Sequence, residues 1–131
     1  MHKYELKVFH ADTDCYKVVW HGNYLRYLEQ ARCAFVKNAN NGINGLEEEG
    51  ILTPVINIDI KYKHSAVLYD DLVVETCIEE TKGIRLTFLQ KIFKKDTDIL
   101  VVEARVTCVL IDSDGKLLRK LPQQILDMME K

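Results

Sequence analysis

The sequence lacks any long apolar run, and none of its 131 residues belongs to a stretch able to cross a bilayer. It also lacks an excess of positive charge. Its 18 Lys and Arg residues stand against 20 Asp and Glu residues, for a formal net charge of −2, which argues against general nucleic-acid binding. No secretory leader precedes the first strand-like residues, so the expected location is cytoplasmic. We therefore expect neither a membrane span nor a nucleic-acid partner.

Cysteine pairing and glycine-rich phosphate motifs are also missing. The four cysteines, Cys15, Cys33, Cys77 and Cys108, show neither Cys-x-x-Cys nor zinc-finger spacing, so reduced thiols are expected. No loop has the glycine pattern that cradles phosphates, and there are no repeats or linkers. The chain is long enough for one core and too short for two ordinary domains. Residues 1–131 are therefore predicted to form a single domain.

What is present is a clear set of periodicities. Residues 4–9 alternate between apolar and polar, and from Asn23 apolar residues recur at helical spacing for roughly five turns. A short helical turn is expected at 46–49, and Pro122 is expected to open a terminal helix. Strand-like runs cover 54–63, 71–80, 84–93 and 99–111, and the short turns between them favour antiparallel neighbours. The pattern predicts an α+β fold, a five-stranded antiparallel sheet wrapped around one long helix.

Residues 12–29 carry most of the functional information. A strand ends at Asp12 and Asp14, and His21 follows seven residues after Asp14 at the start of the predicted helix. A helix start presents N–H groups and partial positive charge, which favour developing negative charge. A base facing such a dipole is the minimum equipment for hydrolysing an activated carbonyl. The candidate catalytic residues are Asp14 and His21, and the candidate ligands of the carbonyl oxygen are Gly22, Asn23 and Tyr24.

Plainer explanations exist for the same residues. Asp14 could simply cap a turn, and His21 could be an ordinary helix-start or interface histidine. Asp12 is expected to fix the loop rather than to react. His10, Asp12 and Asp14 have the period-two spacing of ligands on one strand face, but no second cluster supplies further ligands. We therefore expect no metal and no resident cofactor.

Seven short motifs stand in order along nearly the whole chain: Asp12-Thr13-Asp14, Val19-Trp20-His21-x-Asn23-Tyr24-Leu25, Glu29-x-x-Arg32, Gly50-Ile51-x-x-Pro54-Val55, Tyr69-Asp70-Asp71, Asp114-Gly115-Lys116 and Leu121-Pro122. This ordered set resembles the 4-hydroxybenzoyl-CoA thioesterase family, in particular its short-chain acyl-CoA thioesterase branch. The resemblance implies the hot-dog fold and a homodimer or homotetramer with the active site at a subunit interface. It also implies cofactor-free hydrolysis of acyl-CoA. In it, Asp14 matches the catalytic aspartate and His21 matches an active-site His/Tyr position.

The chain departs from that family in two places. Many members carry glycine near Lys17, and many carry proline where this chain has His64-Ser65-Ala66; both differences bear on which acyl group is bound. Related hot-dog enzymes can place their carboxylate on the long helix, so Glu29 is a reserve carboxylate, although a pairing with Arg32 explains it more simply. The phosphates of coenzyme A require cations, although solvated strand faces look the same. The candidates are Lys61, Lys63, Lys82 and Arg85.

The sequence therefore predicts an acyl-CoA thioesterase that acts on a short-chain or aromatic acyl-CoA. Two alternatives stay open. One is a hot-dog protein that binds acyl groups or coenzyme A without turnover, against which the intact Asp14 and His21 argue. The other is a thioesterase for acyl-carrier-protein thioesters, which a direct comparison of the two kinds of thioester would separate.

Overall fold

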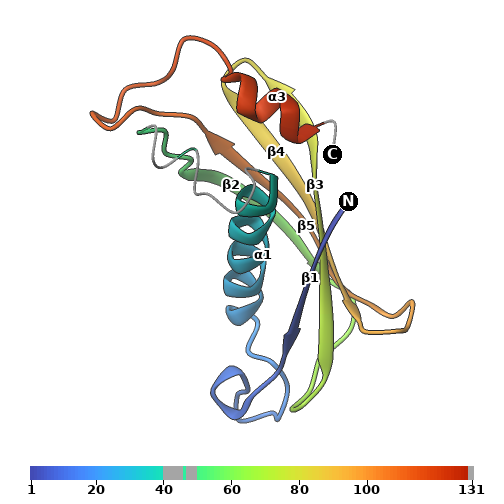
Figure 1. Cartoon of the computed structure of the whole chain (residues 1–131). Coiled ribbons are helices and arrows are strands. Elements are labelled where there is room, and N and C mark those ends of the chain that lie inside the picture. The colour runs from blue at the N-terminus through green and yellow to red at the C-terminus, as the bar shows by residue number, and fades with distance from the viewer. Residues whose placement is uncertain (40–45, 47–49, 130–131) are drawn as a thin grey trace.

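The computed structural model describes residues 1–39, 46 and 50–129, which form one curved antiparallel sheet and the helices beside it. The elements in chain order are β1 (His2–Lys7), η1 (His10–Asp12), α1 (Asn23–Ala39), β2 (Val55–Tyr62), β3 (Asp71–Lys82), β4 (Arg85–Lys94), β5 (Leu100–Val109) and α3 (Gln123–Met129). The strands lie in the order β1-β3-β4-β5-β2. Figure 1 shows α1 lying along the concave side of the sheet. The predicted α+β hot-dog architecture is confirmed, with α3 as a second, short helix.

Helix α1 begins at Asn23 and ends at Ala39, where the periodicity placed it. Its residues at helical spacing form one buried face, because positions three and four apart lie above one another on a helix. This face comprises Tyr24, Tyr27, Leu28, Ala31 and Phe35. It packs on strands of the sheet in two hydrophobic clusters, one near the helix start and one near its end. Leu46 is helical and buried, whereas the remainder of the turn expected at 46–49 lies outside the described residues.

Strands β3 and β4 form a long hairpin that turns at Gly83, whose φ of +61° suits glycine. Alternate residues of both strands are buried. Two of these core positions are polar: Thr76 and Gln90 are both fully buried and lie opposite one another in the register. The hairpin thus carries a polar pair into the core beneath α1.

Strand β1 is shifted from its expected position at 4–9. It covers His2–Lys7, pairing with β3 from Thr76 to Asp71. Val8 continues the pairing outside this ladder: its N–H donates to the Asp70 carbonyl at 3.0 Å, and its own carbonyl accepts from the Tyr69 N–H at 2.9 Å. The chain therefore leaves the sheet after Val8 and enters η1 at His10.

Strand β2 is an edge strand whose apolar face is only partly covered. It pairs with β5 on one side only. The alternation seen in the sequence predicts one buried face, yet Ile56 is 48% exposed, Ile58 36% and Tyr62 49%. On the same face Ile60 packs against the core, and the Tyr62 ring lies 5.7 Å from that of Tyr24. In a single chain the face is therefore open mainly at Ile56 and Ile58, together with the hydrogen-bonding groups of the strand edge.

No helix in the described part of the chain combines the length and apolar character needed to span a bilayer.

Candidate active site

Asp14 opens a tight turn in the loop between η1 and α1. Thr13 bridges to Val19, and the Asp14 N–H donates to the Val18 carbonyl at 2.9 Å. The half-buried Asp14 side chain accepts the Tyr16 N–H on Oδ1 at 2.8 Å. One carboxylate oxygen therefore caps the turn, which is the structural role that Asp14 could have without any part in catalysis. The other, Oδ2, is the atom to which a chemical role can be assigned.

Lys17 closes this turn in a strained conformation. Its N–H donates to the Asp14 carbonyl at 3.0 Å, and its φ is +66°. That region favours glycine, because a Cβ atom there crowds the backbone. The glycine that many family members carry near this position suits the same turn, so the turn survives in this chain at the cost of some strain.

Asp12 holds the loop in place, as expected. Its Oδ2 accepts the Phe9 N–H at 2.9 Å. Its carbonyl oxygen accepts both the Trp20 N–H at 2.9 Å and the side-chain amide of Asn23 at 2.8 Å. These bonds of Asp12 attach the loop that carries Asp14 to Asn23, the first residue of α1.

His21 is exposed and packs against two aromatic rings. Its ring centroid lies 5.2 Å from that of Trp20 and 6.4 Å from that of Tyr62. The Tyr62 hydroxyl also donates to the His21 carbonyl at 3.3 Å. Because Tyr62 is the last residue of β2, His21 lies where the helix start meets the open edge strand.

Gly22 lies directly against the Trp20 indole. A Cβ added at Gly22 would lie 2.4 Å from the Trp20 ring, well inside contact distance. The absence of a side chain lets the ring cover the backbone just before α1 begins.

The three backbone groups expected to bind the carbonyl oxygen are not equivalent. The Asn23 N–H already donates to the Trp20 carbonyl at 2.8 Å, so it is not available to bind a substrate oxygen. The N–H groups of Gly22 and Tyr24 remain candidates. The Tyr24 side chain is buried, and its hydroxyl accepts the Ala66 N–H at 3.2 Å. Burial raises the pKa of the Tyr24 phenol, so this side chain stays neutral and anchors the segment before β3.

The four cations proposed for coenzyme A lie at two ends of the sheet. Lys61 is on β2 and Lys63 directly follows that strand; they flank Tyr62, whose hydroxyl donates to the His21 carbonyl. Lys82 and Arg85 face one another across the turn of the β3–β4 hairpin. Leu72 marks the active-site end of the sheet, because it lies at the other end of β3 and pairs with β1 just before the active-site loop. Ten residues at about 3.3 Å each separate Lys82 from Leu72, a distance of roughly 33 Å. Within one chain, Lys61 and Lys63 are therefore the nearer candidates.

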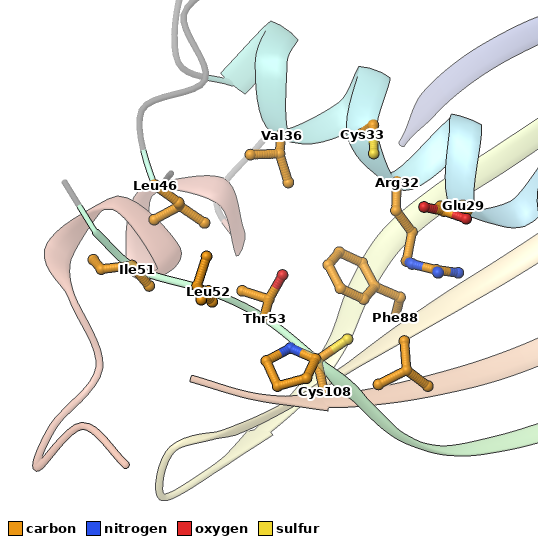
Figure 2. A pocket seen from close by; sticks show the side chains of 12 residues that line it. Glu29, Arg32, Cys33, Val36, Leu46, Ile51, Leu52, Thr53, Phe88 and Cys108 are labelled. Atoms are coloured by element: carbon orange, nitrogen blue, oxygen red, sulfur yellow. The ribbon is translucent and has the colours of Figure 1, made fainter. Parts of the chain in front are cut away.

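Glu29 and Arg32 line a pocket of about 620 Å³ beside α1. The two do not form an ion pair among the described residues. Instead, an Arg32 N–H donates to Gln90 Oε1 at 3.0 Å. The Gln90 amide nitrogen donates in turn to the Leu28 carbonyl and to Thr76 Oγ1, both at 3.0 Å. Figure 2 shows Glu29 and Arg32 together at one end of this pocket.

The network of Arg32, Gln90 and Thr76 was missed from sequence, although a signal exists. Residues 72, 74, 76 and 78, and 86, 88, 90 and 92, share the core-facing phase of two strands. Thr76 and Gln90 interrupt that apolar phase at paired positions. Polar side chains at core-facing positions are buried only when they are hydrogen-bonded. Thr76 and Gln90 therefore indicate a polar partner on the helix that packs over the sheet.

The alternative of a metal site on His10, Asp12 and Asp14 finds no geometric support. Throughout residues 1–39, 46 and 50–129, no three His, Cys, Asp or Glu side chains are placed to hold a metal ion. Asp12 and Asp14 instead accept backbone N–H groups, and the His10 ring lies 3.3 Å from the Tyr69 hydroxyl.

An antiparallel sheet curled around one helix is the architecture expected of the hot-dog fold. Comparisons with known proteins show the family and the enzyme class. The family model described as the thioesterase-like superfamily matches residues 8–129. The chain is 33% identical to the acyl-CoA thioesterase YbgC of Haemophilus influenzae, over 81% of this chain and 79% of that protein. It is 29% identical to the long-chain acyl-CoA thioesterase FadM of Escherichia coli, over 92% and 97%.

A similar solved structure comes from Aquifex aeolicus. That protein superimposes with a TM-score of 0.88 at 26% identity, covering 98% of this chain and 99% of its own. The chain belongs to the thioesterase-like superfamily. As a member it is a thioester hydrolase, which confirms the family and the enzyme class expected from the motifs.

Proposed function

We propose that this protein hydrolyses acyl-CoA thioesters to the free acid and coenzyme A, with Asp14 as the essential carboxylate. The observation that carries the proposal is the bond network around Asp12, which fixes the loop bearing Asp14 to the start of α1. Two of the relatives are named acyl-CoA thioesterases. A thioester carbonyl is electrophilic and a thiolate leaves readily, so one positioned carboxylate and a polarising dipole suffice.

The reaction can follow either of two routes through the same residue. In the first, Asp14 takes a proton from water while the water oxygen attacks the thioester carbon, and the carbon–sulfur bond then breaks to release the thiolate. In the second, Asp14 attacks the carbon itself, the carbon–sulfur bond breaks to release the thiolate, and water then hydrolyses the resulting mixed anhydride to the free acid and the Asp14 carboxylate. In both routes the carbonyl oxygen gains negative charge, which the N–H groups of Gly22 and Tyr24 would stabilise at the helix start. His21 orients the substrate near the sulfur atom.

The substrate range we propose includes short-chain and aromatic acyl-CoA, with no metal or other cofactor required. Lys61 and Lys63 would attract the phosphates of coenzyme A, because they lie at the same end of the sheet as His21. The free cysteines Cys15, Cys33, Cys77 and Cys108 suit a reducing compartment, so we place the reaction in the cytoplasm.

We further propose that the active form is a homodimer, or a homotetramer built from such dimers. The support is the open face of β2, where Ile56, Ile58 and Tyr62 are exposed on an edge strand. Antiparallel pairing of β2 with its copy would be isologous and would cover this face. It would also bring a second chain next to His21, because Tyr62 contacts His21.

Thiol release from acetyl-CoA, hexanoyl-CoA and benzoyl-CoA, measured with EDTA present, tests the activity. We expect turnover of at least one of these substrates without an added divalent ion. The same acyl groups carried on acyl-carrier protein should react more slowly. Faster reaction of the carrier-protein thioesters would support the alternative, a thioesterase for acyl-carrier-protein thioesters. Binding of these acyl-CoAs with no thiol released from any of them would overturn the proposed function.

A further inference from the structure

The hydroxyl of Tyr27 is a buried polar group that the proposed reaction leaves unused. Tyr27 lies on α1, is 4% exposed and packs in the hydrophobic cluster near the helix start. Its hydroxyl has no hydrogen-bond partner among the described residues. An unpaired buried hydroxyl costs free energy that a phenylalanine of the same shape would avoid. The acceptors close to this hydroxyl therefore decide what it can do.

The Asp12 carboxylate is such an acceptor. Burial raises the pKa of the Tyr27 phenol, and the negative charge of Asp12 raises it further, so the phenol keeps its proton and can donate it to a carboxylate. Asp12 Oδ2 accepts the Phe9 N–H at 2.9 Å, and Oδ1 has lone pairs for a second donor. A neutral phenol and a half-buried carboxylate thus lie near one another without a bond of hydrogen-bonding geometry.

Helix α1 holds Tyr27 on the side from which it can reach this carboxylate. Asn23 and Tyr27 are four residues apart, so their side chains lie one turn apart on the same face of the helix. The Asn23 amide binds the Asp12 carbonyl at 2.8 Å, which places Asp12 beside this face. The Tyr27 ring also packs edge-on against that of Tyr24, with centroids 6.1 Å apart. This packing fixes the direction of the hydroxyl.

Asp12 is the residue through which a contact on α1 can act on Asp14. Its carbonyl accepts both the Trp20 N–H and the Asn23 amide, and Asp14 follows two residues later. Figure 1 shows this segment of the chain directly below the start of α1. Hydrogen bonds in active sites are often long or poorly aligned in the free enzyme and tighten when the substrate is bound. A small movement of this loop toward the helix would pair the two groups.

We propose that Tyr27 is a positioning residue whose hydroxyl donates to Asp12 Oδ1 when a thioester occupies the site. The bond holds the loop that carries Asp14 against α1 while the thioester reacts. Its energy offsets the cost of closing the loop, so its loss changes KM little, whereas a misplaced Asp14 lowers kcat. This inference rests on the proposed function, with Asp14 as its essential carboxylate.

The first test is Tyr27→Phe, measured with whichever of acetyl-, hexanoyl- and benzoyl-CoA turns over fastest. We expect kcat to fall about tenfold, the lower limit for one hydrogen bond to a charged group, with KM within about threefold. Thermal stability should be unchanged or raised, because the substitution removes an unpaired hydroxyl. A wild-type kcat would overturn the proposal. So would a fall in kcat that only follows a loss of folded protein.

Tyr4→Phe is the matched control for the loss of a hydroxyl. Tyr4 packs against the same hydrophobic cluster, and its hydroxyl donates to Gln30 Oε1 at 3.5 Å. Because this contact does not involve the loop that carries Asp14, kcat and KM should stay unchanged. A tenfold fall in Tyr4→Phe as well would attribute the effect of Tyr27→Phe to general loosening of the core, which contradicts a positioning role.

A double-mutant cycle shows whether Tyr27 acts through Asp12. Asp12→Ala removes the acceptor and keeps the main-chain carbonyl that binds Asn23. In the Asp12→Ala background, Tyr27→Phe should lower kcat by less than about twofold, because the effects of two residues in one contact are not additive. Equal falls in both backgrounds would show that Tyr27 acts without Asp12 and would overturn the proposal.

Hydrogen exchange of the Trp20 N–H separates failure of this contact from failure of the proposed function, since it requires no turnover. That N–H donates to the Asp12 carbonyl at 2.9 Å, so its exchange reports how firmly the loop is held. S-hexyl-CoA, a thioether that cannot be hydrolysed, should slow the exchange at least about fivefold in the wild type and not in Tyr27→Phe.

The two readouts fail independently. Slowed exchange that depends on Tyr27, with no thiol released from any acyl-CoA, would mean that the proposed function is wrong and the contact correct. Thiol release with equal exchange in the wild type and Tyr27→Phe would mean that the function is correct and the contact wrong. Exchange that S-hexyl-CoA leaves unaltered in the wild type would likewise overturn the contact.

Discussion

The side-chain amide of Asn23 donates to the carbonyl oxygen of Asp12 at 2.8 Å, joining the first residue of α1 to the loop that presents Asp14. The Trp20 N–H binds the same oxygen. The position of the carboxylate relative to the helix start thus depends on an amide side chain that is itself buried. The proposed catalytic role of Asp14 would therefore depend on the two bonds that the Asp12 carbonyl accepts.

Asn23→Ala should remove that contact. We expect the free energy of unfolding to fall by about 1 kcal/mol for the lost hydrogen bond, and kcat to fall about tenfold because Asp14 is no longer held in place. Thermal unfolding and steady-state kinetics measure the two effects. Arg26→Ala is the control, since Arg26 makes only a 3.5 Å contact with the same side chain. A wild-type kcat in Asn23→Ala would show that the loop is fixed by other contacts.

Asp14→Asn should lower kcat at least ~100-fold, because the amide cannot act as a base. The fold should be kept, since an Asn Oδ1 can still accept the Tyr16 N–H that Asp14 accepts now. Glu29→Gln is the matched carboxylate control and should keep most of the activity. If Asp14→Asn retains more than about a third of kcat while Glu29→Gln abolishes turnover, the base lies on the helix and our assignment is wrong.

Lys17→Gly should stabilise the protein by about 1 kcal/mol, because glycine adopts a φ of +66° without the cost that Lys17 bears. Thermal unfolding would then shift upward by about 4 °C. Lys17→Ala removes the same charge and keeps a Cβ atom, so it should give no such gain. Equal stabilisation by the two variants would attribute the effect to charge rather than to backbone strain.

The Lys61→Ala/Lys63→Ala double variant should raise KM for acyl-CoA several-fold and weaken its dependence on salt, with kcat little changed. Lys82→Ala/Arg85→Ala removes two cations at the far end of the β3–β4 hairpin and should leave KM unchanged. The reverse result would place the phosphates at the hairpin turn.

Ile58→Asp should convert the proposed homodimer to a monomer, because it places a charge on the exposed part of the apolar face of β2. Sedimentation or light scattering at micromolar concentration measures the mass. Ile99→Asp is the control, since Ile99 is exposed to a similar degree and lies outside β2. A wild-type protein that is monomeric and fully active would contradict the proposed assembly.

Much of the fold was readable because its signals are local. Alternation within 71–80 and 84–93 and the helical spacing after Asn23 depend only on which neighbours share a face, and the structure has strands and a helix there. The same alternation in β2 correctly indicated an apolar face. It could not show that one chain leaves that face open, because cover depends on what packs against it.

The site divides in the same way. Asp14 and His21 could be proposed as catalytic candidates from their order before a helix, and the loop-fixing role of Asp12 from its place beside them. Only the tertiary structure shows that Trp20 occupies the Asn23 N–H and that Lys82 and Arg85 lie far along the sheet. It alone joins Arg32 to Gln90, 58 residues away in sequence. Sequence periodicity determines which residues face inward, whereas strand register and the bending of the sheet determine which of them meet.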